Sequence, residues 1–256
     1  CGIGPVRMPG GVRSTRRTLN SCVDIITLRE PDSMEELHRF GVEGPELILA
    51  SDPALTLSPA PAEEIDAEFN SAGADPEGKY ICFALRRWPG FEEKAPAFAA
   101  AARYAHEKYG LTPAFVSINH KSDGEAAAAV ASLMDGVERV FIPGPLPSAL
   151  AIGVMSRMEI VVSMRLHGLI FAAGQGVPLV GVSYDPKVTA FLRCVDGGCV
   201  TLEDLTEDGL CRLIDAAAAL REDPAALEAS VARLRAIEHK NTASAARLLG
   251  KQVNDQ

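Results

Sequence analysis

Basic side chains stand at the ends of three predicted strands, where the chain turns into a helix. They are Arg86 and Arg87, then Arg165 with His167, and finally Lys187. Guanidinium and ammonium groups bind phosphate and carboxylate, and an imidazole exchanges a proton near neutral pH. Because the carboxyl ends of parallel strands share one edge of a sheet, these residues predict a small pocket for a compact anion.

Two of these junctions carry positive charge where a helix begins. Ser163 suits the cap of one helix and puts Arg165 and His167 in its first turn. Asp185 suits the cap of another helix and puts Lys187 in its first turn. A cation at a helix N-terminus costs stability unless a bound anion offsets it. Each residue also has a plainer interpretation, as a solvated arginine pair, a structural histidine or an exposed lysine.

The elements that must position these residues alternate along the chain. Continuous apolar runs predict strands, and amphipathic segments between them predict helices, so right-handed crossovers and a parallel sheet covered on both faces are expected. The predicted strands are 23–28, 46–50, 79–86, 112–118, 138–142, 159–163 and 178–183. The predicted helices are 32–40, a polar helix that ends near residue 70, 92–109, 123–134, 147–157, 165–174, 186–194, 206–221 and 224–248.

A proline-rich stretch at residues 57–62 divides this α/β pattern in two. Residues 59–256 contain enough strands for a complete Rossmann-like domain with closing helices. Residues 1–58 contain too few, and are expected to be the C-terminal part of an N-terminal Rossmann-like domain whose beginning is absent.

Composition excludes several classes of protein. The 25 basic and 34 acidic residues give a net charge of −9, which argues against a nucleic-acid binder. No apolar run approaches the ~20 residues of a membrane span. Six scattered cysteines form no CxxC pair, so neither a disulfide framework nor a metal site is expected. Dinucleotide, P-loop and hydrolase motifs are also missing.

The residues around the second and third junctions closely resemble a known family. The runs 162–173 and 176–188 resemble the polysaccharide pyruvyl transferase family, and within it the CsaB-like branch of bacterial cell-wall pyruvyl transferases. Further matches to that branch lie at Gly2–Pro5, at Ile26–Glu30 with Ser33, at Gly41 and Val42, and at Asp52–Ala54.

The resemblance implies both a fold and an activity. The fold is two Rossmann-like domains in a glycosyltransferase-B-like arrangement, with the site between them. The activity is transfer of a pyruvyl group from phosphoenolpyruvate to two hydroxyls of a sugar, which gives a cyclic ketal and phosphate. In CsaB-like members the acceptor is N-acetylmannosamine in a lipid-linked precursor of a secondary cell-wall polysaccharide, and the ketal anchors S-layer-homology domains.

The same resemblance sets the expected partners and location. A lipid-linked or nucleotide-linked sugar is the expected acceptor, phosphoenolpyruvate is the donor, and no cofactor, metal or nucleic acid takes part. A cytoplasmic enzyme is expected, acting at the inner face of the cell membrane with at most peripheral membrane contact.

Site residues carry over by position. Arg165, Leu166 and His167 match the family's Arg-Leu-His motif. Arg86, or its neighbour Arg87, matches the donor-binding arginine. Arg86 and Arg165 are therefore expected to hold the phosphate and carboxylate of the donor, with His167 as the general acid–base.

Lys187 and Tyr184 of the third junction complete the expected substrate site, with Lys187 stabilising the departing phosphate. Two other functions stay open, because a fold does not fix a function. One is a nucleotide-sugar-dependent glycosyltransferase or epimerase of the same architecture, which would act on a UDP-sugar without phosphoenolpyruvate. The other is a non-catalytic, interaction-only remnant, which would leave the basic pocket empty.

Overall fold

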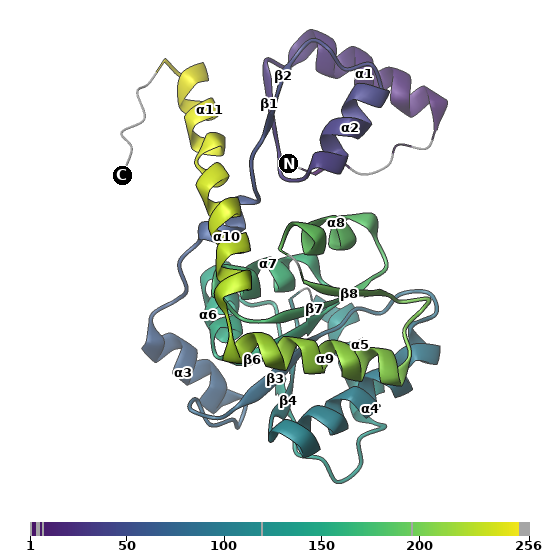
Figure 1. The fold of residues 1–256 in the computed structure, drawn as a ribbon, viewed down its shortest axis with the longest axis vertical. Helices are drawn as coiled ribbons and strands as arrows, with labels where there is room; N and C mark the ends of the chain where they lie inside the picture. The colour runs from purple at the N-terminus through teal and green to yellow at the C-terminus, as the bar shows by residue number, and fades with distance from the viewer. Residues whose placement is uncertain (1, 4–5, 7, 119, 196, 251–256) are drawn as a thin grey trace. The chain divides into compact units, whose positions relative to one another are not determined.

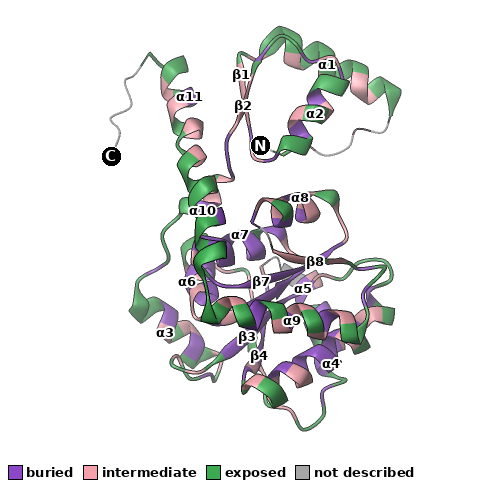
Figure 2. Cartoon of the chain, viewed as in Figure 1, coloured by how far each residue is buried: buried purple, intermediate pink, exposed green. Residues whose placement is uncertain are grey.

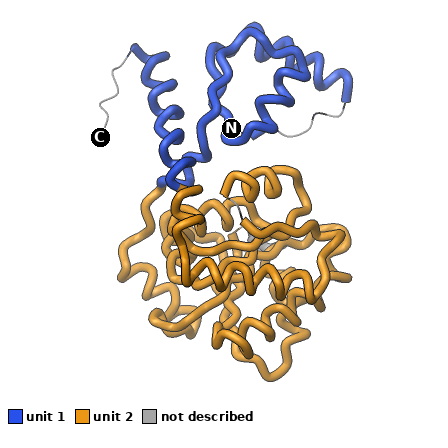
Figure 3. The backbone as a smooth tube through the Cα atoms, in the orientation of Figure 1, with its two compact units in different colours: residues 1–56, 232–256 blue, residues 57–231 orange. Residues whose placement is uncertain are grey.

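A computed structural model of the chain describes residues 2–3, 6, 8–118, 120–195 and 197–250. The chain divides into two compact units (Figure 3): unit 1 comprises Cys1–Thr56 with Ala232–Gln256, and unit 2 is Leu57–Val231. This division differs from the predicted domains 1–58 and 59–256, because the C-terminal segment goes with the first unit instead of the second. Each unit is described on its own below.

Unit 2 contains a six-stranded parallel sheet in the order β5-β4-β3-β6-β7-β8 (Figure 1). Its strands are β3 (Tyr80–Ala84), β4 (Thr112–Val116), β5 (Val140–Ile142), β6 (Met158–Ser163), β7 (Leu179–Ser183) and β8 (Gly198–Thr201). Counted within the unit, this is the doubly wound order 3-2-1-4-5-6 of a Rossmann fold. The direction of winding therefore reverses between β3 and β6.

Helices cover both faces of this sheet (Figure 1). On one face α4 packs against α5 and α9; on the other, α6 packs against α3 and α7, and α7 against α8. Right-handed crossovers that run in opposite directions along a sheet require this split. The helices are α3 (Ala62–Ser71), α4 (Phe91–Tyr109), α5 (His120–Ala131), α6 (Ser148–Ser156), α7 (Leu166–Gly174), α8 (Pro186–Cys194) and α9 (Glu207–Glu222).

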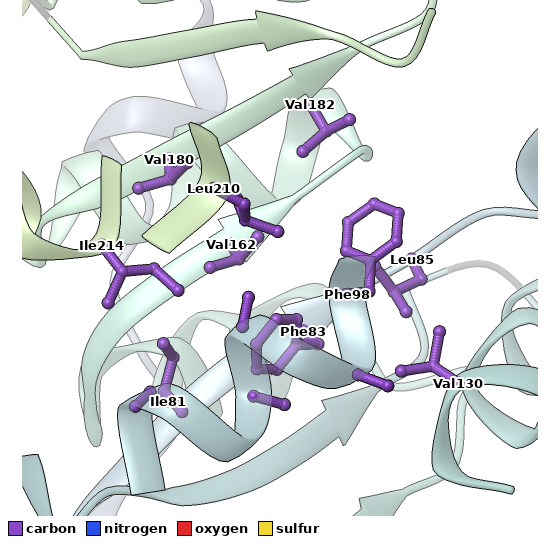
Figure 4. Packing of buried hydrophobic residues seen from close by; sticks show 14 of the residues in the cluster. Ile81, Phe83, Leu85, Phe98, Val130, Val162, Val180, Val182, Leu210 and Ile214 are labelled. Carbon is purple, nitrogen blue, oxygen red and sulfur yellow. The ribbon is translucent and has the colours of Figure 1, made fainter. Parts of the chain in front are cut away.

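The core of unit 2 lies between the sheet and the α4 face. Phe83 from β3 and Phe98 from α4 are fully buried there, together with Leu210 and Ile214 from α9 (Figure 4). Figure 2 shows the same pattern, with the central strands buried and the outer faces of the helices exposed. Two-sided burial explains why the strands read as continuous apolar runs in the sequence.

Unit 1 is smaller, and its parallel pair of strands is β1 with β2. Leu28 and Leu37 are fully buried in its core, together with Phe40 and Val42. Its elements are α1 (Pro9–Cys22), β1 (Ile25–Leu28), α2 (Pro31–Arg39), β2 (Glu46–Leu49), a 3-10 turn at Pro53–Thr56 and α11 (Lys240–Leu248). Helix α10 (Ala225–Glu238) spans the boundary between the units.

Contacts of α11 explain why the C-terminal segment belongs to unit 1. Arg247 pairs with Glu46 of β2, and Lys240 Nζ donates to the carbonyl oxygen of Leu49 at 3.3 Å. Helix α11 also packs against β1. The predicted helix over 224–248 is thus two helices, separated at His239.

The predicted strands and the other helices are confirmed, with ends shifted by a few residues. Helix α1 and strand β8 were not predicted. Helix α1 has no buried residue, and β8 is an edge strand with alternating half-buried and exposed positions, so neither shows a clear apolar pattern. In the described parts of the chain, no helix is long and apolar enough to cross a membrane.

Candidate functional site

The reversal of winding in unit 2 brings two predicted basic junctions together. Ala84 and Ser163, the last residues of β3 and β6, are register partners, and Met164 N donates to the Ala84 carbonyl oxygen at 3.0 Å. Arg86 and Arg165 each follow two residues later. In open α/β sheets, ligands bind outside the carboxyl ends of the strands at this switch point. The two arginines therefore leave neighbouring strands where a ligand is expected.

Ser163 organises the turn between β6 and α7. Its hydroxyl accepts a hydrogen bond from Arg165 N at 2.9 Å and donates one to Arg165 O at 2.8 Å. The N-cap itself is Arg165, not Ser163, so the predicted cap is wrong by two residues. Gly168 keeps this turn tight, because a Cβ there would lie 2.7 Å from Ser163 Oγ. The N–H groups of the first turn of α7 have no acceptor inside the helix and suit an anion.

Arg165 is held by a carboxylate that sequence analysis missed. Its Nε donates to Asp123 Oδ1 at 3.0 Å and to Oδ2 at 3.2 Å, and its Nη2 donates to Ser122 Oγ at 3.1 Å and to Asp123 Oδ1. The Arg165 side chain is 12% exposed and that of Asp123 only 1%. Asp123 lies in the first turn of α5, 42 residues away in sequence, so only the fold reveals this pair. The pair fixes the guanidinium in one orientation.

Arg86 is held by two aromatic rings. Its Nη1 donates to Tyr184 Oη at 2.6 Å, and its guanidinium carbon lies 4.9 Å from the ring centroid of Trp88 and 5.0 Å from that of Tyr184. The two rings are 4.6 Å apart. The structure thus brings together two predicted site residues, Arg86 and Tyr184, from the loops after β3 and β7. A cation that lies near aromatic rings gains a favourable electrostatic interaction.

Arg87 and Lys187 are paired with acidic residues near them. Arg87 is 55% exposed, with its Nε 3.0 Å from Glu92 and its Nη1 3.2 Å from Glu125. Lys187 Nζ lies 3.3 Å from Asp185, whose side chain also accepts from Lys187 N at 3.1 Å and so caps α8 as predicted. Their roles toward a substrate stay predictions.

The remaining two predicted residues begin α7. Leu166 is buried at its first position, whereas His167 is exposed at the second. The His167 ring centroid lies 5.9 Å from that of Phe171, one turn further along. An exposed imidazole beside the N-terminus of a helix is open to a bound substrate.

A cavity of about 740 Å³ opens at the same edge of the sheet. Of the residues predicted for the site, Tyr184 lines it. The described lining residues are Trp88, Pro89, Gly90, Glu93, Lys94, Ser183, Tyr184, Asp185, Pro186, Thr189, Arg193, Thr201, Leu202 and Glu203. Within the described residues, no group of three or more His, Cys, Asp or Glu side chains could hold a metal ion.

Several solved structures share this fold. The UDP-GlcNAc 2-epimerase from Neisseria meningitidis, bound to UDP-GlcNAc, matches 93% of this chain and 64% of its own, with a TM-score of 0.67 and 14% identity. A glycosyltransferase from Rickettsia africae matches 97% of this chain and 70% of its own, with a TM-score of 0.60 and 14% identity. The UDP-GlcNAc 2-epimerase from Methanocaldococcus jannaschii, in complex with UDP-GlcNAc and UDP, matches 76% of this chain and 54% of its own, with a TM-score of 0.60 and 13% identity.

These similarities establish the fold class, which is α/β with parallel sheets as in glycosyltransferases and epimerases of the glycosyltransferase-B type. The chain spans between 54% and 70% of the length of these three structures. No curated protein sequence matches the chain significantly. A sequence profile, however, covers residues 1–186 of the 256, including every predicted site residue except Lys187. By this match the chain belongs to the polysaccharide pyruvyl transferase family.

Proposed function

We propose that this protein transfers a pyruvyl group from phosphoenolpyruvate to two hydroxyls of a sugar, forming a cyclic ketal and releasing phosphate. Family membership supports the class of reaction. The observation that carries the donor assignment is the placement of Arg86 and Arg165 at the ends of adjacent strands, beside the N-terminus of α7.

Phosphoenolpyruvate carries a phosphate and a carboxylate close together, so it requires two cationic groups in a fixed geometry. Arg86 is held by its aromatic neighbours and Arg165 by Asp123. In our proposal these guanidinium groups bind the two anionic ends of the donor, assisted by the N–H groups of the first turn of α7. Prior orientation of both side chains lowers the entropy that binding must overcome.

His167 transfers the proton that the chemistry needs. It protonates the methylene carbon of phosphoenolpyruvate, which becomes the methyl group and leaves positive charge at the adjacent carbon. One sugar hydroxyl adds to that carbon and its proton restores His167. The carbon–oxygen bond to phosphate then breaks, the second hydroxyl closes the ketal, and its proton leaves with the phosphate. Lys187 and the N–H groups of α7 stabilise the departing phosphate.

The CsaB-like resemblance supports a finer proposal for the acceptor. The proposed acceptor is N-acetylmannosamine in a lipid-linked precursor of a cell-wall polysaccharide. A sugar linked to a nucleotide is the alternative form of the acceptor. With a lipid-linked acceptor, the enzyme would work in the cytoplasm at the inner face of the membrane. The donor is a substrate, and the proposed steps use no cofactor or metal.

Calorimetric titration with phosphoenolpyruvate tests the proposal. We expect saturable binding that weakens about tenfold or more in Arg86→Ala, because a hydrogen bond to a charged group contributes about 1.5–3 kcal/mol. Arg87→Ala decides between the two neighbouring arginines considered for this role: the Arg87 guanidinium is exposed and paired with Glu92 and Glu125, so we expect less than a threefold change. Equal losses in both variants would contradict the donor assignment.

A titration with UDP-GlcNAc distinguishes pyruvyl transfer from the main alternative, which is a nucleotide-sugar-dependent glycosyltransferase or epimerase. The similar folds of UDP-GlcNAc epimerases are compatible with a nucleotide-sugar enzyme. If UDP-GlcNAc binds and phosphoenolpyruvate does not, and if no phosphate is released in the presence of both donor and sugar, pyruvyl transfer is refuted.

A further inference from the structure

The 740 Å³ cavity differs in chemistry from the proposed donor site formed by Arg86 and Arg165. Two aromatic rings, Trp88 and Tyr184, form part of its lining, and Trp88 is 39% exposed. Large exposed aromatic side chains in a concave site are typical of ligand-binding surfaces. The cavity volume of about 740 Å³ lies within the range of small-molecule sites, which is about 300–1,000 Å³.

The charges in the cavity do not favour a second anion. Three carboxylates line it, those of Glu93, Asp185 and Glu203, against two cations, Lys94 and Arg193. Lys94 Nζ is already engaged, because it donates to the carbonyl oxygens of Glu203 at 2.6 Å and of Leu205 at 3.0 Å. Asp185 in turn pairs with Lys187 at 3.3 Å, so the lining has no excess of positive charge that would attract a phosphate or a nucleoside diphosphate.

The same groups suit a neutral sugar. Carboxylates accept hydrogen bonds from sugar hydroxyls, and the hydroxyls of Thr189 and Thr201 in the lining can donate or accept. The face of a pyranose that carries C–H bonds packs on an aromatic ring such as that of Trp88. The weakly positive hydrogens of these bonds then meet the negative face of the ring. We propose that this cavity is the acceptor subsite and binds a neutral pyranose against Trp88, an inference that rests on the proposed pyruvyl transfer.

Arg86 connects this subsite to the donor. Its guanidinium contacts both aromatic rings of the cavity, at 4.9 Å from Trp88 and 5.0 Å from Tyr184. A pyranose stacked on Trp88 therefore lies next to the arginine that holds the donor. This is the juxtaposition that attack of a sugar hydroxyl on the pyruvyl carbon requires.

Trp88 is the only tryptophan of the chain, so tryptophan fluorescence reports directly on this cavity. The intact chain is titrated with N-acetylmannosamine and with N-acetylglucosamine, each with and without phosphoenolpyruvate. We expect a saturable change in fluorescence, weakened threefold or more in Glu93→Gln. The matched control is Glu92→Gln, the adjacent carboxylate that pairs with Arg87 outside the cavity lining, which should bind the sugar like the original chain.

The outcomes separate this inference from the proposed function. Phosphoenolpyruvate binding by calorimetry without any sugar-dependent fluorescence change, with or without donor, overturns the acceptor subsite and leaves the donor assignment standing. A sugar response without phosphoenolpyruvate binding supports a sugar site at Trp88, but it refutes pyruvyl transfer and overturns the assignment of that site as the pyruvyl acceptor. A saturable response to UMP but not to the sugars overturns the subsite in favour of a nucleotide site, and no response to any ligand overturns it outright.

Discussion

Removing the Asp123 carboxylate tests whether Arg165 depends on a buried partner. The side chains are 1% and 12% exposed, respectively, so Asp123→Ala leaves a largely buried guanidinium without its counter-charge. Breaking a buried ion pair in this way costs about 3–5 kcal/mol. At about 2–4 °C per kcal/mol for a domain of this size, the melting temperature should fall by about 6–20 °C. Thermal unfolding followed by circular dichroism, with urea titration for the free energy, measures both quantities.

The double variant Asp123→Ala with Arg165→Met is the control. It removes the orphaned charge and keeps an apolar stem in place, so we expect it to unfold at a higher temperature than Asp123→Ala alone. Loss of the favourable interaction between Asp123 and the α5 N-terminus is common to both variants and cancels in the comparison. A cost below about 1 kcal/mol for the single variant, the value of a solvated pair, would refute the reasoning. So would a double variant no more stable than the single one.

Three further predictions concern the packing of a glycine, the titration of a carboxylate and the reactivity of the cysteines. Gly181→Ala places a Cβ 2.1 Å from Leu192 Cδ1 of α8, so overpacking should lower the unfolding free energy measured in urea by about 1–3 kcal/mol. Burial alone would raise the pKa of Asp215, but hydrogen bonds from two tyrosines and a lysine hold that pKa below its usual value. This carboxylate therefore stabilises the folded state above about pH 4, and the difference in unfolding free energy between the original chain and Asp215→Asn should shrink from pH 6 to pH 2.5. Burial raises the pKa of the Cys82 thiol, so this thiol should react with iodoacetamide only after the protein unfolds, whereas the exposed Cys22 should react in the folded state. Mass spectrometry maps the modified cysteines, and modification of Cys82 as fast as Cys22 would show that β3 is not a core strand.

Apolar patterning predicts most of this fold, because burial on both faces leaves a strong signal. The strand at 158–163 contains the apolar run Ile160–Val162, and the sequence predicts its bounds to within one residue. Elements with few buried positions gave no such signal: α1 has no buried residue, and β8 is exposed at every second position. The break at His239 has no glycine or proline near it, so neither of the two strongest helix-breaking residues marks it in the sequence.

The site was predictable where chemistry is local in sequence. Arg86 and Arg165 could be placed at strand ends from the alternation alone. The groups that orient them could not, because Asp123 is 42 residues from Arg165 and Tyr184 is 98 residues from Arg86. Such partners are fixed by the order of the strands, and a single sequence does not state that order.

The helix that follows the Arg86 loop has an unusual composition where it meets the core. Its buried positions there include Ala95, Ala99, Ala101, Ala102 and Ala105. Alanine has no side-chain torsion to freeze, whereas longer side chains lose up to about 1.5–2 kcal/mol of rotamer entropy on burial. Packing of α4 against the core therefore costs almost no side-chain rotamer entropy at these five alanine positions. The loop carrying Arg86 and Trp88 is thus continuous with a helix that packs at these alanine positions without freezing long side chains.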